Sequence, residues 1–189
     1  MNKRLCFASD YMFGAVPSIL TRLQELNEQG FPGYGNDDLC EAAKEKLRTA
    51  CEAPEAAVWF LAGGTQTNAV VISALLRPWE GVLAPETGHI NTHEAGSVEA
   101  SGHKILMLPQ KEGKLLPETV LQCVQNYEQD ENRLHTVQPR LVYLTQPTEY
   151  GTLYSLEELH AFRRLCDEHG LLLYVDGARL AYALGSPEN

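Results

Sequence analysis

The alternation of short apolar runs with amphipathic helical stretches most constrains the fold of this chain. Five runs have strand character: AVWFLA (57–62), GVLAP (81–85), HKILML (103–108), RLVYLT (140–145) and LLLYVD (171–176). Helical patterns lie between most of them, and the clearest covers residues 155–170. Strands that are apolar almost throughout and separated by helices predict an α/β fold with a mostly parallel sheet sandwiched by helices.

The segment before these runs predicts two helices joined by a turn-rich connection. Residues 17–29 begin with Pro17, which favours a first helical turn, and Gly30 follows as a stop signal. Asp37 or Asp38 is then expected to cap a second helix. We predict an N-terminal arm, helix and loop over residues 1–36 and a ligand-binding domain over residues 37–189.

Composition narrows the class of partner. The chain has 189 residues and a net charge of −10, which disfavours a nucleic-acid or anionic-membrane surface and favours a small-molecule ligand. Its five cysteines form no CxxC pair, which is typical of reduced thiols in the cytoplasm. No run approaches the roughly 20 apolar residues of a membrane span. We therefore expect a cytoplasmic protein without nucleic-acid or membrane partners, and residues 129–139 as its most mobile loop.

The motif GGTQTN (63–68) stands between an apolar run and a helical stretch. Glycines allow a tight turn, and Thr65 and Gln66 would open the helix with free backbone amides, an arrangement that suits a phosphate group. The motif is neither GxGxxG nor a P-loop, so it lacks the marker of a dinucleotide or triphosphate site. An ordinary glycine turn with a threonine N-cap explains it equally well.

The motif ETGHINTHEAG (86–96) follows another run and contains two histidines four residues apart. On one helix face, His89 and His93 could share a metal ion, but the order is not HExxH and no third ligand is indicated. We predict no metal. A flat imidazole stacked on a cofactor ring, or a polar helix start, fits the pattern better.

Asp176 ends the last apolar run, and Arg179 stands three residues later. A local ion pair or a helix cap is one explanation. The other is a carboxylate that keeps a ring nitrogen protonated, beside an arginine that binds an anionic group. A phosphate cradle, a stacking group and such a carboxylate together are the parts that pyridoxal 5′-phosphate (PLP) requires.

The sequence resembles the low-specificity L-threonine aldolase family, within the β-eliminating lyases of the aspartate-aminotransferase-type PLP fold (fold type I). The matching pieces are FASDY, GYGNDD, FLAGGTQTN, TGHINTHEAG, VYLTQPTEYGTLY and YVDGARL, in this order along the chain. The resemblance covers essentially the whole chain but only the first part of the family's length.

Site residues follow from this resemblance position by position. Gly64, Thr65 and Gln66 would hold the phosphate; His89 would stack on the ring and handle the substrate's β-hydroxyl proton. Asp176 would pair with the ring nitrogen. Arg179 would bind near the ring oxygen of the cofactor and, together with Ser9, would bind the substrate's carboxylate. The remaining implied roles are a subunit-boundary position for Tyr34 and a second active-site histidine in the region of His135.

The activity that the resemblance implies is aldol cleavage of L-threonine or L-allo-threonine to glycine and acetaldehyde, in a homodimer or homotetramer with shared active sites. Family members also carry a lysine, in a G-G-T-K-like stretch, and a small C-terminal domain, both beyond the motif DGAR. Neither precedes Asn189, so we expect a truncated chain with little activity of its own. Another PLP-dependent β-eliminating lyase, or a non-catalytic binding module, are the alternatives.

Overall fold

The computed structural model describes residues 8–187 and divides the chain into two compact units, with the boundary between Phe60 and Leu61. The first unit contains the helices α1 (Pro17–Leu26) and α2 (Asp38–Ala50). The second contains a four-stranded sheet and the other helices. The predicted division of the chain into an N-terminal arm (1–36) and a ligand-binding domain (37–189) stays a prediction.

Local signals in the sequence set the start of both helices in the first unit. Proline occupies the first position of α1, where its missing N–H is not needed. The carboxylate of Asp37 accepts a hydrogen bond from the backbone N–H of Cys40 at 2.9 Å and so caps α2. The end of α1 was predicted less well, because this helix stops at Leu26 instead of continuing to residue 29.

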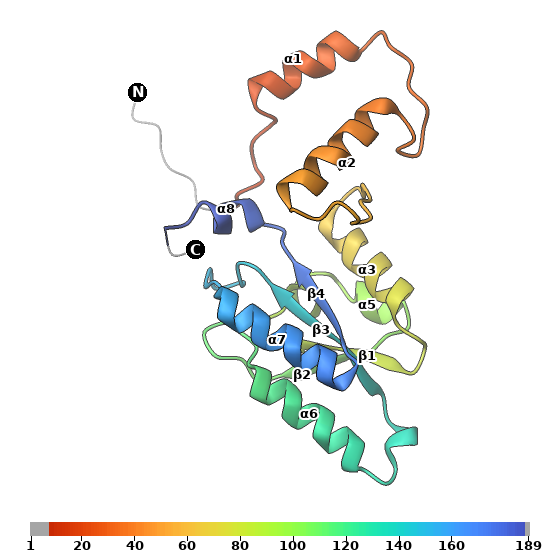
Figure 1. Ribbon diagram of the computed structural model, residues 1–189, viewed down its shortest axis with the longest axis vertical. Coiled ribbons are helices and arrows are strands. Elements are labelled where there is room, and N and C mark those ends of the chain that lie inside the picture. The colour runs from red at the N-terminus through yellow and green to blue at the C-terminus, as the bar shows by residue number, and fades with distance from the viewer. Residues whose placement is uncertain (1–7, 188–189) are drawn as a thin grey trace. The chain divides into compact units, whose positions relative to one another are not determined.

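The second unit is built on a parallel sheet with the strand order β2-β1-β3-β4, which confirms the predicted fold class (Figure 1). The strands are β1 (Glu80–Pro85), β2 (Ile105–Leu108), β3 (Gln138–Thr145) and β4 (Leu172–Asp176). Each neighbouring pair runs in the same direction.

Helices cover both faces of this sheet (Figure 1). On one face lie α3 (Gly64–Leu75), α4 (His89–Thr92) and α5 (Ser97–Ala100); α6 (Pro117–Gln129) and α7 (Leu156–His169) cover the other. Successive residues of β3 serve opposite faces: Leu141 and Tyr143 pack with Ile72 of α3, whereas Val142 and Leu144 pack with Phe162 of α7. Burial on both faces explains why the strands are apolar almost throughout.

Helix α7 has both of its ends defined by the sequence. Ser155 accepts a hydrogen bond from the backbone N–H of Glu158, whose side chain accepts one from the backbone N–H of Ser155, a reciprocal capping box. Gly170 follows the helix with a φ of 62°, a left-handed conformation that glycine adopts without steric cost. The short helix α8 (Leu180–Leu184) follows β4.

Two local predictions were wrong, and a third segment has more structure than expected. Residues 57–62 form no strand but an irregular, exposed segment in which Trp59 is 82% exposed, because no strand of residues 8–187 pairs with it. The helix expected around residues 91–100 is divided into α4 and α5, since Gly96 has a φ of 75°. The loop 129–139 includes a 3₁₀ turn, η1 (Arg133–His135), and the start of β3.

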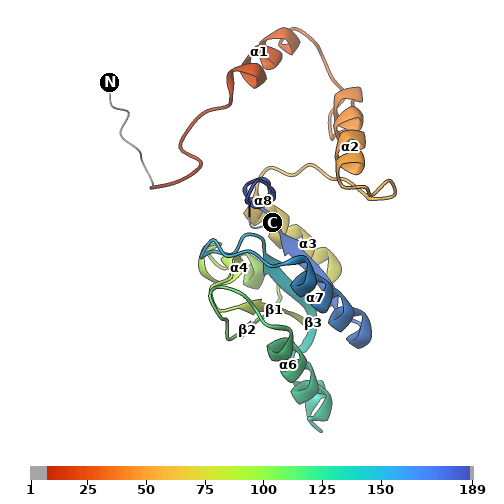
Figure 2. The same cartoon turned by 60° about the vertical axis from the view of Figure 1, so that its left-hand side comes forward.

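The strand order creates a switch point between β1 and β3. The chain leaves β1 toward β2 at one edge, and it leaves β3 toward β4 at the other edge. The two loops therefore separate beyond the carboxyl ends of neighbouring strands, where open α/β sheets bind ligands. Figure 2 shows these connections from a second side. No helix within residues 8–187 has the length and apolar character needed to cross a bilayer.

Candidate active site

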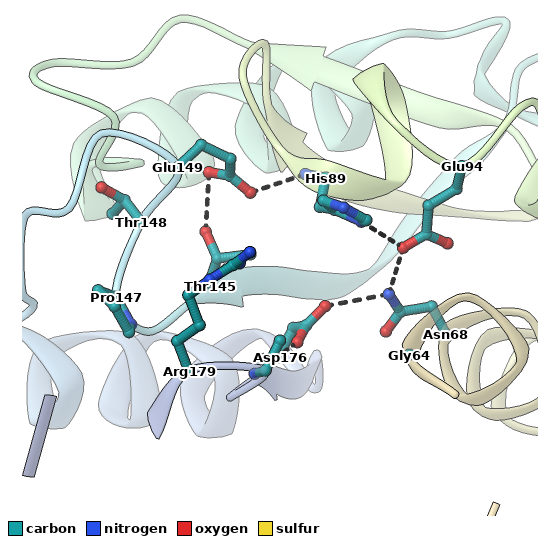
Figure 3. Close-up of a pocket in the computed structure, with 11 residues that line it drawn as sticks. Gly64, Asn68, His89, Glu94, Thr145, Pro147, Thr148, Glu149, Asp176 and Arg179 are labelled. Atoms are coloured by element: carbon teal, nitrogen blue, oxygen red, sulfur yellow. Dashed lines mark hydrogen bonds and ion pairs between the residues drawn. The ribbon is translucent and has the colours of Figure 1, made fainter. Parts of the chain in front are cut away.

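A pocket lies at the switch point, and all of its lining residues belong to the second unit (Figure 3). They come from the start of α3, from the loops that follow β1, β3 and β4, and from the ends of β3 and β4. They are Gly64, Asn68, His89, Glu94, Thr145, Pro147, Thr148, Glu149, Asp176, Ala178 and Arg179. The pocket thus gathers three carboxylates, one imidazole and one guanidinium.

Asp176 is the last residue of β4, and three donors hold its carboxylate. Oδ2 accepts hydrogen bonds from Tyr143 Oη at 2.8 Å and from Asn68 Nδ2 at 3.0 Å. Oδ1 accepts one from the backbone N–H of Ala178 at 3.0 Å. The helix-cap explanation of this residue is wrong, because α8 begins at Leu180 with Arg179 as its N-cap and no side-chain cap. The three contacts instead fix the carboxylate at the pocket wall.

Asn68 connects the first helix of the second unit to the end of its last strand. This buried residue of α3 donates its two amide hydrogens to different carboxylates, Asp176 and Glu94, the latter at 2.6 Å (Figure 3). Its Oδ1 accepts a hydrogen bond from Tyr174 Oη at 2.6 Å. Because a flipped amide would place an oxygen against two carboxylates, only this orientation satisfies all the partners.

Glu94 and Glu149 engage different parts of His89. Oε1 of Glu94 lies 2.8 Å from His89 Nδ1, and its Oε2 accepts a hydrogen bond from Ser97 Oγ. Glu149, in the loop after β3, accepts from the backbone N–H of His89 at 2.8 Å and from Thr145 Oγ1 at 3.0 Å. The contact of Glu149 with the backbone of His89 joins the loop after β1 to the loop after β3 across the switch point.

Two tyrosines support the pocket from the sheet. Burial, together with the nearby charge of Asp176, raises the pKa of Tyr143 well above its usual range. Burial, with Asp176 and Glu94 nearby, raises the pKa of Tyr174 to about 12. Both side chains are therefore neutral at physiological pH, and their hydroxyl groups are hydrogen-bond donors to Asp176 and Asn68.

The start of α3 is the predicted phosphate site. Gly63 is the N-cap, and the first intrahelical bond runs from the N–H of Thr67 to its carbonyl, so the amides of Gly64, Thr65 and Gln66 precede the helical ladder. Gly64 lines the pocket, whereas Thr65 and Gln66 are exposed beside it. A helix N-terminus of this kind favours an anion.

Arg179 lies at the mouth of the same pocket, where its exposed side chain belongs to the N-cap residue of α8. The structure therefore brings Gly64, His89, Asp176 and Arg179 together, as predicted. These groups fit PLP: a carboxylate for the ring nitrogen, an imidazole for the ring face, amides for the phosphate and a guanidinium for a carboxylate. The individual roles stay predictions.

Other candidates lie elsewhere. Ser9 accepts a hydrogen bond from the backbone N–H of Tyr11, and Tyr34 is fully exposed with a φ of 65°; both belong to the first unit. His135 lies in η1, which precedes β3, and is not among the residues that line the pocket. Its role stays a prediction.

His93 and the lysines of the described range do not line the pocket. The ring centroids of His89 and His93 lie 5.6 Å apart, and within residues 8–187 no cluster of three or more histidine, cysteine or acidic side chains has metal-binding geometry. No lysine of the described range lines the pocket, and Lys3 lies outside that range.

The fold and the pocket define an open parallel α/β protein with a ligand site at the carboxyl ends of its strands. Residues 7–187 match the family model described as β-eliminating lyase. The chain belongs to this family.

Relatives of known name agree with this assignment. The low-specificity L-threonine aldolase of Pseudomonas aeruginosa is 35% identical over 179 residues, which are 94% of this chain and 50% of the relative. That of Saccharomyces cerevisiae is 31% identical and is covered over 37% of its length. The chain thus spans about half the length of the first relative and a smaller share of the second.

Solved structures show the same fold. A threonine aldolase of Leishmania major has a TM-score of 0.90 and 44% identity, over 94% of this chain and 51% of that one. An aminotransferase of Escherichia coli has a TM-score of 0.68 at 16% identity, which supports the fold alone. The predicted family and fold class are therefore confirmed.

Five site residues were not singled out from the sequence: Asn68, Glu94, Tyr143, Glu149 and Tyr174. Asn68 and Glu94 lie inside the motifs GGTQTN and THEAG, and Glu149 lies inside QPTEYG. Asn68, Glu94 and Glu149 are polar residues that follow the end of an apolar run or the start of a helix. Position alone could have marked them, but their partners depend on strand order.

Proposed function

We propose that this chain contributes to PLP-dependent aldol cleavage of L-threonine or L-allo-threonine to glycine and acetaldehyde. The observation that carries the proposal is the convergence of Asp176, His89 and the start of α3 on one pocket. The names of the relatives from Pseudomonas aeruginosa and Leishmania major support the substrate class.

Each residue has a distinct proposed task. Asp176, held by three donors, presents a fixed carboxylate to a pyridine nitrogen. The amides at the start of α3 bind the phosphate, and Arg179 binds the substrate's carboxylate. When bound, PLP supplies an electron sink for the carbanion at Cα.

Cleavage also requires a base for the substrate's hydroxyl group. His89 takes the β-hydroxyl proton, the Cβ–O bond becomes the carbonyl of acetaldehyde, and the Cα–Cβ bond breaks. Its electron pair stays at Cα, which then takes up a proton and gives glycine. Glu149 fixes the backbone of His89 during these steps.

Another PLP-dependent β-eliminating lyase is the second candidate, because the matched family carries that description and the same pocket residues would serve. The two reactions differ in their products. Aldol cleavage of threonine gives glycine, whereas β-elimination from cysteine, tyrosine or tryptophan gives pyruvate and ammonia. We also propose slow turnover by this chain alone, because no lysine within residues 8–187 lines the pocket.

The first experiment measures PLP binding to this chain by equilibrium dialysis. We expect saturable binding that weakens about tenfold or more in Asp176→Ala, since the ring nitrogen loses its charged partner. The matched control is Asp167→Ala, an exposed carboxylate of α7 that pairs with Arg163. Absence of saturable PLP binding would contradict the proposal.

The second experiment identifies products by mass spectrometry, which detects even slow turnover. Glycine and acetaldehyde from threonine would support aldol cleavage. Pyruvate from cysteine without glycine from threonine would instead support β-elimination. Bound PLP with neither product would support the non-catalytic binding module. The homodimer or homotetramer implied by the resemblance is tested separately by sedimentation equilibrium.

A further inference from the structure

Glu94 is a fully buried carboxylate that contacts the candidate base. Its side chain is 0% exposed, whereas that of His89 is 40% exposed. Asn68 donates to Oε1, Ser97 donates to Oε2, and His89 Nδ1 lies 2.8 Å from Oε1. A carboxylate removed from water needs such partners, so these three contacts account for its stability in the interior.

The contacts also locate a proton. Asn68 Nδ2 donates to Oε1 and Ser97 Oγ donates to Oε2, so both oxygens of Glu94 are placed as hydrogen-bond acceptors. The hydrogen between Glu94 and His89 therefore belongs to Nδ1 of the imidazole. In a neutral imidazole one nitrogen is a donor and the other an acceptor, so Nε2 carries the lone pair.

Asn68 keeps Glu94 in place from the other side. Its second amide hydrogen is bound to Asp176, and its Oδ1 is bound by Tyr174 Oη. The amide therefore cannot turn without losing contacts at both ends. A hydrogen-bonded chain thus runs from Asp176 through Asn68 and Glu94 to His89 (Figure 3).

We propose that Glu94 is a positioning residue that holds neutral His89 as the Nδ1–H tautomer and so presents Nε2 to the pocket as a hydrogen-bond acceptor. The ligand group that matches this acceptor is a hydroxyl. The inference rests on the proposed function only in naming that hydroxyl, the one at Cβ of the substrate. The tautomer itself is a property of the protein without ligand.

Nitrogen-15 NMR of the histidine-labelled chain tests the proposal, with the His89 signals assigned by their loss in His89→Asn. At a pH where the ring is neutral, Nδ1 is expected to carry the proton in the major form. Glu94→Ala removes the acceptor and should shift the major form to Nε2–H. Glu94→Gln should restore the Nδ1–H form, because its amide oxygen can still accept. Glu99→Gln, an exposed glutamate of α5, is the control.

The NMR results distinguish a tautomer set by Glu94 from one that is independent of Glu94. A major Nε2–H form in the unmodified chain, or an unchanged tautomer in a folded Glu94→Ala, would overturn the proposal. Should Glu94→Ala unfold, as judged by circular dichroism, the measurement on the unmodified chain still decides. The spectra are recorded without PLP or amino acid, so a failure of the proposed function leaves this result unaffected.

Discussion

Asn68 and Asp176 lie 108 positions apart in the sequence, and the side-chain amide of Asn68 donates to Asp176 Oδ2 over 3.0 Å. This bond joins the first helix of the second unit to the end of its last strand. The same amide binds Glu94, so one neutral side chain separates two carboxylates. Replacing this neutral side chain by a charged one should lower the stability of the second unit.

Asn68→Asp is expected to destabilise the second unit by about 3 kcal/mol, because a third carboxylate would face two others in a buried position. Urea denaturation followed by circular dichroism measures this change. The matched control, Asn126→Asp, lies on the exposed side of α6 and should change stability by no more than about 0.5 kcal/mol. Equal effects of the two substitutions would refute the bridging role of Asn68.

Tyr174 predicts how stability changes at alkaline pH. Its folded-state pKa of about 12 lies above the ordinary value of 10.0. Between these values the unfolded chain releases the phenolic proton and the folded chain keeps it, so the free energy of unfolding falls as pH rises through this window. Below pH 10 this contribution is constant. Chemical denaturation at pH 9, 10 and 11 measures the slope.

Tyr174→Phe should reduce that slope without abolishing it, because the pKa of Tyr143 is raised as well and Tyr143 still contributes. The substitution should also cost about 1 kcal/mol at neutral pH, because Asn68 Oδ1 loses its donor. The control Tyr182→Phe removes a hydroxyl from a side chain that is 69% exposed and should leave the slope unchanged. A slope in Tyr174→Phe equal to that of the unmodified chain would show that Tyr174 does not contribute to it.

The capping box of α7 gives a prediction remote from the pocket. Ser155→Ala removes the side-chain acceptor for the N–H of Glu158 and should lower the free energy of unfolding by about 1 kcal/mol. Thermal unfolding is the measurement. Ser73→Ala, at an exposed position within α3, should be neutral or slightly stabilising, because alanine favours a helix interior.

Glu158 predicts a response to acid. Burial opposes its ionisation, but hydrogen bonds from Lys114 and Ser155 lower the pKa of Glu158 below its model-peptide value of 4.5. This contribution is complete above pH 4.5 and is lost as pH falls through the lower folded-state pKa. Lys114→Met should weaken the acid dependence; because the pair is partly exposed, the effect should stay below about 1 kcal/mol. Lys46→Met on exposed α2 is the control.

Much of the fold could be predicted from local patterns. Residues 81–85, 140–145 and 171–176 match β1, the later part of β3, and β4, because strands buried on both faces leave continuous apolar runs. The run 57–62 is also apolar throughout, but it forms no strand. A strand requires a hydrogen-bonding neighbour, and the sequence of a single run says nothing about its neighbour.

Some residues of the site could be predicted from the sequence and others could not. His89 and Asp176 were predicted because each stands beside a recognisable motif at the end of an apolar run. Tyr143 and Tyr174 were missed, because tyrosine in a strand usually serves the core. The hydroxyl group of Tyr143 donates to Asp176 on the neighbouring strand, and that of Tyr174 donates to Asn68 on α3. Both contacts depend on how distant segments pack, which the sequence of one strand does not show.

The strand order also has a consequence for biosynthesis. Asn68 leaves the ribosome long before Asp176, since translation adds on the order of 10 residues per second. During that interval Glu94 is already synthesised, but the amide lacks its second carboxylate partner, Asp176. The pocket cannot form gradually with the emerging chain; it closes when β4 pairs with β3 along Leu141–Thr145. Ligand binding by nascent chains of increasing length should therefore begin abruptly, once Asp176 has left the exit tunnel.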